Sequence, residues 1–366
     1  MLPVNPAYNT LSESFTLPIG DMRMRKPVIA VTMGDPAGIG PEVIAKAIPH
    51  DWVLKACTLL IIGSERALRR AMRITGTSFP YKCLPAGEEI PPSFSDVVLW
   101  NDETHLREHI PLAVTDPSCG ASAFAWLERA IQLAMGKQVA AIVTAPLNKA
   151  ALNQAGHPYA GHTEILADKT GTKEYSLMLI AGDFRVVHVT CHVAMAQVSS
   201  LLTVERVTST IRLFHEALTR LDGAAPRIAV CAFNPHAGEG GLFGDEEIRV
   251  ITPAVHQCAG EGIHVSGPFP PDSIFPQMTG GRYNGVVAMY HDQGHIPFKL
   301  ANFKFDPEKQ EWQRVTGVNV TLGLPIIRAS VDHGTAFDIA GTGKASEQSL
   351  LDAIRVALKL AGGVAL

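Results

Sequence analysis

Short apolar runs alternate with amphipathic stretches along most of the chain. Val28–Met33, Thr58–Gly63 and Val139–Ala145 are apolar runs of strand length, as expected of strands buried on both faces. Before the third run, apolar side chains recur at helical spacing at Phe124, Leu127, Ile131 and Ala134. Downstream, helix, strand, helix, strand and helix are predicted in turn at 204–221, 227–233, 245–259, 285–290 and 346–360. This alternation predicts an α/β fold with a largely parallel sheet.

The composition indicates a globular protein and argues against several other classes. The 366 residues are enough for about two domains, and 46% apolar content with 18% charged residues excludes a disordered chain. The net charge of −4 gives no basic field for nucleic acid, and no apolar run reaches the length of a membrane helix. The six cysteines form no Cys-x-x-Cys pair, which predicts reduced thiols in a cytoplasmic protein.

Two segments fall outside the regular pattern. Residues 1–25 are rich in proline, serine and asparagine and lack a continuous apolar segment, so we expect a flexible arm rather than a secretory signal. The polar run Phe303–Arg314 is interpreted as a solvated surface excursion.

Three of the fourteen histidines follow predicted strands. His192 comes after Val186–Cys191, and His236 and His291 come after the strands near residues 230 and 288. Ligands of open α/β sheets bind at the carboxyl ends of strands, so the three imidazoles could converge on one metal ion. They could also be simple hydrogen-bonding residues. The local His291-x-x-x-His295 spacing is not taken as a metalloprotease motif, because Asp292 replaces glutamate and because Gly294 and Pro297 oppose a helix.

Two glycine clusters and two cationic residues are further candidates for binding an anionic ligand. Asp35–Glu42 opens a predicted helix but lacks the third glycine of a dinucleotide fingerprint, and Gly341–Ala345 is not a phosphate-binding P-loop. Each cluster is either an anion site at a helix start or a tight turn. Lys299 follows the His291 motif by eight residues, and Arg328 follows the apolar run Leu322–Ile327. Each of these two cations is either anion-binding or solvated.

Several long motifs occur together and in order: MGDPAGIGPE, VTAPLNK, GHTE, NPHAGEGGLFGDEE, YHDQGHIPFK and VNVTLGLPIIRASVDHGTAFDIAGTG. From about Lys26 onward the chain resembles the 4-hydroxythreonine-4-phosphate dehydrogenase family of pyridoxal phosphate biosynthesis. The resemblance implies the two-domain α/β fold of isocitrate and isopropylmalate dehydrogenases, with the active site in the interdomain cleft. We expect residues 26–150 plus 285–366 to form the cofactor domain, and residues 151–284 to form the domain with the metal, substrate and dimer contacts.

The resemblance also implies the site residues. A divalent metal, zinc first and cobalt, magnesium or manganese otherwise, would bind His192, His236 and His291 in a site shared between the subunits of a homodimer. The substrate contacts would be His162, Thr163, Lys299, Asn319 and Arg328. By analogy with the wider fold, the adenosine half of NAD or NADP would lie on His333, Gly334, Thr335, Asp338 and Gly341. Asp292 and Lys299 are the catalytic candidates, with Asp292 serving in proton transfer or, preferably, in orienting the adjacent metal ligand.

The implied reaction is oxidation of 4-phosphohydroxy-L-threonine at its 3-hydroxyl, followed by decarboxylation to 3-amino-2-oxopropyl phosphate. The connection between Lys299 and Asn319 is longer than is usual in this family. It resembles a paralogous branch that acts on D-threonate or D-erythronate 4-phosphate. Two other classes stay open, a zinc hydrolase using the same three histidines and a catalytically silent binding protein.

Overall fold

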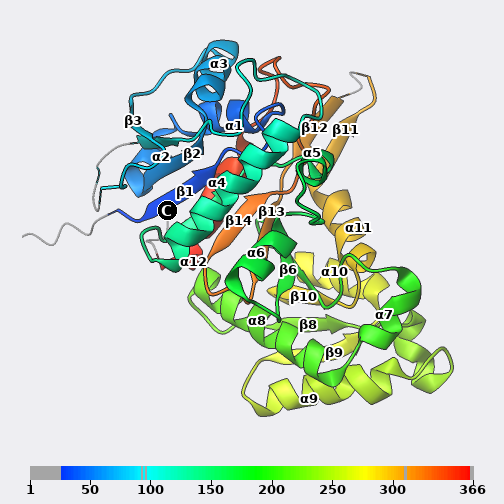
Figure 1. The fold of residues 1–366 in the computed structure, drawn as a ribbon. Coiled ribbons are helices and arrows are strands. Elements are labelled where there is room, and N and C mark those ends of the chain that lie inside the picture. Colours follow the sequence, from blue (N-terminus) through cyan, green and yellow to red (C-terminus); the bar gives the residue numbers. More distant parts are fainter. Residues whose placement is uncertain (1–25, 92–93, 95–96, 309–310, 363–366) are drawn as a thin grey trace, which may run out of the picture.

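The computed structural model describes residues 26–91, 94, 97–308 and 311–362. The predicted arm, residues 1–25, lies outside the described residues. The described chain folds around a 12-stranded sheet in the order β3-β4-β2-β1-β5-β14-β13-β6-β7-β10-β8-β9, with a separate two-stranded hairpin, β11-β12 (Figure 1). None of the described helices combines the length and apolarity needed to cross a membrane.

The elements have the following bounds. The strands are β1 Val28–Thr32, β2 Thr58–Gly63, β3 Tyr81–Pro85, β4 Val97–Asn101, β5 Ala141–Thr144, β6 Ser176–Ala181, β7 Phe184–His188, β8 Ile228–Cys231, β9 Val265–Phe269, β10 Gly285–Ala288, β11 Phe303–Asp306, β12 Glu311–Val315, β13 Val318–Leu322 and β14 Arg328–Val331. The helices are α1 Gly40–Ala47, α2 Asp51–Ala56, α3 Glu65–Thr75, α4 Pro117–Met135, α5 Lys149–Gln154, α6 His162–Thr170, α7 Met195–Leu201, α8 Val204–Asp222, α9 Thr252–Gly260, α10 Pro271–Thr279, α11 His291–Asn302 and α12 Gln348–Leu360, with a 3₁₀ segment at Pro235–Gly241 and a π segment at Glu247–Ile251.

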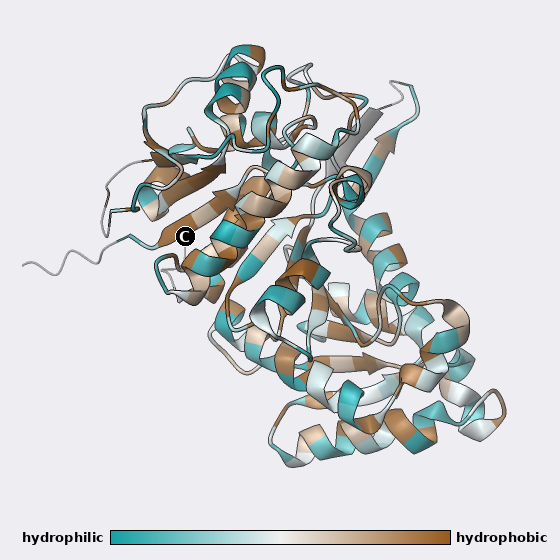
Figure 2. Cartoon of the chain, in the orientation of Figure 1, coloured by the Kyte–Doolittle hydropathy of each residue, from teal (hydrophilic) through white to brown (hydrophobic). Residues whose placement is uncertain are grey.

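The α/β prediction is confirmed. The six strands from β3 to β14 are mutually parallel, and β1, β2 and β5 are buried along their whole length apart from Val28. Helices cover both faces of such a sheet, so its strands carry continuous apolar runs. Figure 2 shows β1 and β2 coloured as hydrophobic along most of their length.

The sheet changes direction in its middle. β13 pairs antiparallel with both β14 and β6, and β6 pairs antiparallel with β7, after which β7, β10, β8 and β9 are again parallel. Figure 1 shows two groups of helices, one around each half of the sheet. β10 lies between β7 and β8, so residues 285–288 pair with the strands of residues 151–284. We therefore propose two domains that share one sheet, with β10 in the second domain rather than the first.

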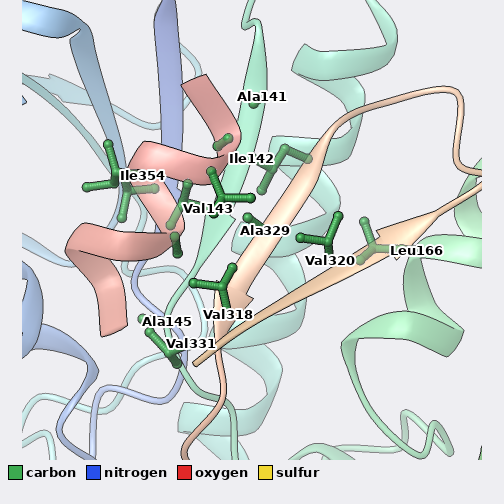
Figure 3. Close-up of a cluster of buried hydrophobic side chains, with 14 of the residues drawn as sticks. Ala141, Ile142, Val143, Ala145, Leu166, Val318, Val320, Ala329, Val331 and Ile354 are labelled. Carbon is green, nitrogen blue, oxygen red and sulfur yellow. The ribbon is translucent and has the colours of Figure 1, made fainter. Parts of the chain in front are cut away.

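Strands β5, β14 and β13 present different chemistry on their two faces. Val143, Ala329, Val318, Val320 and Val331 pack with Ile354 of α12 in the apolar cluster of Figure 3. Since side chains alternate along a strand, the residues between them point to the opposite face, and several of these are polar. The polar face is the floor of the candidate site.

The prediction that residues 291–295 are not helical is wrong. Helix α11 begins at His291 and includes both Gly294 and Pro297. At Gly294 a Cβ atom would lie 2.3 Å from Nε2 of His188 and 2.9 Å from Cγ2 of Val186. Glycine therefore permits α11 to pack closely on β7, and this packing outweighs its low helix propensity. The zincin motif is still absent, since Asp292 occupies the glutamate position.

The polar run after α11 is also more regular than predicted. Phe303–Asp306 and Glu311–Val315 pair as the antiparallel strands β11 and β12. The segment that separates Lys299 from Asn319 is therefore a β-hairpin attached to the end of α11, rather than an irregular excursion.

Candidate active site

A polar stripe crosses one face of β5, β14 and β13. Register pairs Arg328 with Ile142 and Ser330 with both Thr144 and Asn319. Side-chain alternation then places on this face Thr144, Asn319, Thr321, Arg328 and Ser330. All of these except Asn319 are at most 4% exposed, and buried polar groups at this density need partners.

Arg328 is the charged centre of the stripe. Its two terminal nitrogens donate to Oγ1 of Thr321 at 3.3 Å and to Oγ1 of Thr144 at 2.8 Å, whereas Nε has no partner. No carboxylate among the described residues forms an ion pair with it. Burial lowers the pKa of Arg328 to about 9, with Glu164 opposing this shift from a longer distance. The guanidinium is a desolvated cation with donor capacity left over, as expected for an anion-binding residue.

The start of α6 lies close to Arg328. Burial, followed by the charges of Arg328 and Lys149, lowers the pKa of His162 well below its usual value, so His162 is neutral at pH 7. Thr163 and Glu164 follow it in the first turn, where backbone N–H groups lack helical partners. Arg328, Lys149 and this turn together bring positive potential to one place.

Lys299 and Asn319 meet at a third residue. Asp332, just beyond β14, accepts two hydrogen bonds. Its Oδ2 accepts one from the ammonium of Lys299 at 2.7 Å, and its Oδ1 accepts one from the amide nitrogen of Asn319 at 3.0 Å. The ammonium of Lys299 also lies 4.3 Å from the ring centroid of Phe303, the first residue of the hairpin. Two predicted substrate contacts are thus held together by one carboxylate that the sequence analysis did not single out.

Two of the three predicted metal ligands lie close together. The ring centroids of His192 and His291 are 5.9 Å apart. Nδ1 of His192 bonds Oε1 of Glu164 at 3.2 Å, and Nδ1 of His291 bonds Oδ1 of Asp292 at 2.6 Å. A carboxylate that accepts a hydrogen bond from Nδ1 favours the tautomer whose Nε2 carries the free electron pair, which is the arrangement of metal-bound histidines.

The third predicted ligand, His236, is not brought to the other two. It is exposed in the Pro235–Gly241 segment with φ 51°, in a run of left-handed residues anchored by Glu247. Within the described part of the chain, no three His, Cys, Asp or Glu side chains are arranged to hold a metal ion. A single chain therefore brings two of the three predicted histidines together.

Two histidines that the sequence analysis did not select lie beside this pair. His295 stacks on His291 with ring centroids 3.6 Å apart, and His188 lies 4.6 Å from His295. Burial lowers the pKa of His188 to about 3 and that of His295 to about 4. Both rings are neutral at pH 7, so they add no charge beside His192 and His291.

The predicted cofactor loop packs against the first glycine cluster. Ile39 donates its N–H to the carbonyl of Thr335 at 3.0 Å, and Gly38 fits directly against Thr335. Glu42 accepts the backbone N–H groups of Gly341 at 2.5 Å and of Gly343 at 2.8 Å. The two glycine clusters, whose role the sequence left open, therefore pack against each other. In the predicted cofactor loop, Asp338 and Gly334 are exposed and His333 is partly buried.

A cavity of about 490 Å³ opens beside His192. Its lining includes Thr163, Glu164, His188 and Arg206. A larger cavity of about 570 Å³ lies between α8 and residues 320–328, but Arg328 is the one predicted site residue in its lining. One predicted metal ligand, His192, and one predicted substrate residue, Thr163, line the smaller cavity, so we take it as part of the candidate site.

The residues missed from the sequence are Thr144, Lys149, Glu164 and Asp332. A signal for the polar stripe was present, because polar and apolar residues alternate in Val318–Leu322 and again from Arg328 to Val331. The role of Asp332 depends on contacts with residues 13 and 33 positions away, which a sequence pattern does not reveal.

Comparisons with known proteins give matches along most of the chain. Residues 55–357 match the family model of the pyridoxal phosphate biosynthetic protein PdxA. The chain is 46% identical to a D-threonate 4-phosphate dehydrogenase of Cupriavidus necator over 92% of this chain and 97% of the relative. It is 44% identical to a 4-hydroxythreonine-4-phosphate dehydrogenase of Desulfosudis oleivorans over 91% and 96%. The crystal structure of 4-hydroxythreonine-4-phosphate dehydrogenase from Klebsiella pneumoniae superimposes with a TM-score of 0.74 at 41% identity, covering 92% of this chain and all of the other.

Proposed function

Since the chain belongs to the PdxA family, we propose that it oxidises the 3-hydroxyl of a four-carbon, 4-phosphorylated hydroxy acid and then decarboxylates the product. The observation that carries this proposal is Arg328, a buried cation with an unpartnered Nε and no ion pair to a described carboxylate. Such a group is stabilised by a bound anion, and the substrate offers a phosphate and a carboxylate.

Two substrates are favoured by separate observations. The identity to D-threonate 4-phosphate dehydrogenases and the ordered hairpin after Lys299 favour D-threonate or D-erythronate 4-phosphate. The comparable identity to a 4-hydroxythreonine-4-phosphate dehydrogenase favours 4-phosphohydroxy-L-threonine. The two kinds of acid share the phosphate, the 3-hydroxyl and the carboxylate, so the proposed roles of the residues are the same for both.

The roles follow from position and charge. Arg328, with His162 and Thr163 at the start of α6, binds one anionic end of the substrate. Lys299 has N–H groups beyond the one it donates to Asp332, and these bind substrate oxygens where charge develops. Asp292 orients His291 through the 2.6 Å bond to Nδ1, which favours this role over direct proton transfer.

The donor set of His192 and His291 fits a divalent metal, with zinc, cobalt, magnesium and manganese as the candidates. When bound, the ion supplies Lewis acidity to substrate oxygens during oxidation and decarboxylation. The nicotinamide ring of NAD or NADP supplies the hydride acceptor. His333, Gly334, Thr335, Asp338 and Gly341 hold the adenosine half, in a loop already fixed by Glu42.

A homodimer would complete the metal site. Large apolar side chains are exposed on α7, on α11 and in residues 242–248, which follow the Pro235–Gly241 segment: Met195, Ile296, Leu300 at 83%, Leu242 at 73%, Phe243 and Ile248. An apolar surface of this kind is typical of a subunit interface. We propose that His236 reaches the His192–His291 pair of the other subunit. All six cysteines are free thiols, which supports a cytoplasmic location.

The test measures the formation of NADH or NADPH by the purified protein with an added divalent metal. Three substrates are compared: D-threonate 4-phosphate, D-erythronate 4-phosphate and 4-phosphohydroxy-L-threonine. Metal-dependent reduction with one of the three supports the proposal, and the preferred acid identifies the branch of the family. Cleavage of substrate without a nicotinamide cofactor would instead indicate a zinc hydrolase. Binding without turnover would indicate a silent binding protein.

A further inference from the structure

Asp332 joins two parts of the candidate site. It lies one residue beyond β14, its side chain is 6% exposed, and its two oxygens accept separate donors, the ammonium of Lys299 and the amide of Asn319. A carboxylate this deeply placed needs both donors to offset its desolvation. It precedes His333, so it also links the substrate residues to the predicted cofactor loop.

The contact with Asn319 fixes which end of the amide faces the site. Because a carboxylate only accepts, the amide nitrogen must point to Asp332 and the carbonyl oxygen must point away from it. That oxygen, Oδ1, is buried and has no hydrogen-bond partner among the described residues. A buried, unsatisfied acceptor costs on the order of 1–3 kcal/mol, which a ligand that presents a donor would recover.

We propose that Asp332 is a positioning residue that turns the Asn319 amide oxygen and the Lys299 ammonium toward the substrate, and that Asn319 Oδ1 accepts the donor on carbon 2. The inference rests on the proposed function. Its chemistry suits both candidate kinds of acid, since a hydroxyl and an ammonium group at carbon 2 each donate to a carbonyl oxygen. Lys299 is meanwhile held between Asp332 and the Phe303 ring, with its other N–H groups directed to substrate oxygens.

The experiment compares kcat/KM for the preferred acid and for its 2-deoxy analogue, in the wild type and in Asp332→Asn. The wild type should discriminate against the analogue on the order of 100-fold or more, because the analogue leaves Oδ1 unsatisfied. In the variant, an N–H₂ group replaces one of the two carboxylate oxygens that accept these bonds, so either Lys299 or Asn319 faces a donor in its present position. The Asn319 amide is then free to turn, and the discrimination should fall below about tenfold.

Two further variants separate positioning from folding. Asp352→Asn removes a carboxylate of α12 that pairs with Arg355, and it should keep the wild-type discrimination. Asp332→Glu retains a carboxylate and should recover part of the discrimination that Asp332→Asn loses. If Asp332→Asn does not fold, Asp332→Ser replaces it in the same comparison.

The outcomes are distinct. Lower kcat/KM in Asp332→Asn with unchanged discrimination would overturn the positioning role and leave the proposed function standing. Wild-type turnover without preference for the carbon-2 donor would overturn the assignment of Asn319. No turnover by the wild type with any of the three acids would overturn the proposed function, and this inference with it.

Discussion

The carboxylate of Glu42 accepts the backbone N–H of Gly341 at 2.5 Å, across almost 300 residues of sequence. Its second oxygen accepts the N–H of Gly343, so helix α1 fixes the loop proposed to hold the adenosine half of the cofactor. The cost of cofactor binding is lowered when such a loop is ordered in advance.

Replacing Glu42 with glutamine should weaken cofactor binding. The glutamine amide oxygen can still accept one of the two backbone N–H groups, those of Gly341 and Gly343. Its N–H₂ group faces the other N–H, so that hydrogen bond is lost. We expect KM for the nicotinamide cofactor to rise about tenfold while KM for the acid changes little, since a lost charged hydrogen bond costs roughly 1.5–3 kcal/mol. Glu89→Gln, at an exposed loop position, is the matched control. Equal effects of Glu42→Gln on both KM values would argue against a role specific to the cofactor loop.

Replacing Arg328 with methionine should lower catalytic activity while leaving the stability of the fold unchanged or higher. Methionine fills similar volume without a charge, so the desolvation of an unpaired guanidinium is removed and Tm should be unchanged or higher. We expect kcat/KM to fall about 100-fold or more, mainly through KM, because the substrate anion loses its charged partner. Arg220→Met changes an exposed arginine that pairs with Glu216 and serves as the control. Unchanged kinetics in Arg328→Met would remove Arg328 from the substrate site.

The shared metal site predicts complementation between inactive variants. His236→Ala and His291→Ala should each be folded, metal-poor and inactive. In a mixed dimer, the wild-type His236 of one subunit meets the wild-type His192 and His291 of the other, and one site of the two is intact. Co-refolding equal amounts should restore about a quarter of wild-type activity, because half of the dimers are mixed. If all three histidines came from one chain, the mixture would stay inactive and metal-poor.

Sequence reasoning selected most residues of the candidate site but not the contacts between them. Apolar runs identified the strands before His192 and His291, and parallel order among β7, β10 and β8 explains why those two side chains meet. The isolation of His236 depends on left-handed backbone at residues 236–240, which local composition does not specify. Helix α11 was missed because Gly294 and Pro297 are poor helix formers, and packing against β7 outweighs that preference.

Asp35 should make stability depend on pH. Burial raises the pKa of Asp35 to about 6 from its ordinary value of 3.8, and Oδ2 has no partner. Between these values the folded protein retains a proton that the unfolded chain has lost, so stability falls as pH rises from about 4 to 6. Asp35→Asn should remove this penalty, on the order of 3 kcal/mol at pH 7, and retain the bond from Ala37. Unfolding free energies of the two proteins should be similar at pH 4, should diverge between pH 4 and 6, and should differ by a constant amount above pH 6. A constant difference across this range would contradict the proposed titration.

The close packing of α11 on β7 can be tested at Gly294. In Gly294→Ala the new Cβ would lie 2.3 Å from Nε2 of His188, so the helix or the ring must move. We expect a loss of about 1–3 kcal/mol in unfolding free energy, together with lower kcat/KM, because α11 carries both His291 and Lys299. Gly260→Ala is the control, since a Cβ there meets no atom within 4 Å and alanine is the better helix former.

A second substitution shows whether the contact itself is responsible. His188→Ala removes the ring that the new methyl group meets, so the double variant should recover part of the stability that Gly294→Ala loses. Residues in contact are expected to couple by about 0.5–3 kcal/mol in such a cycle. Additive losses would place the effect of Gly294→Ala elsewhere in the helix. Recovered stability without recovered activity would show that the ring of His188 itself contributes to holding His291 and Lys299 in place.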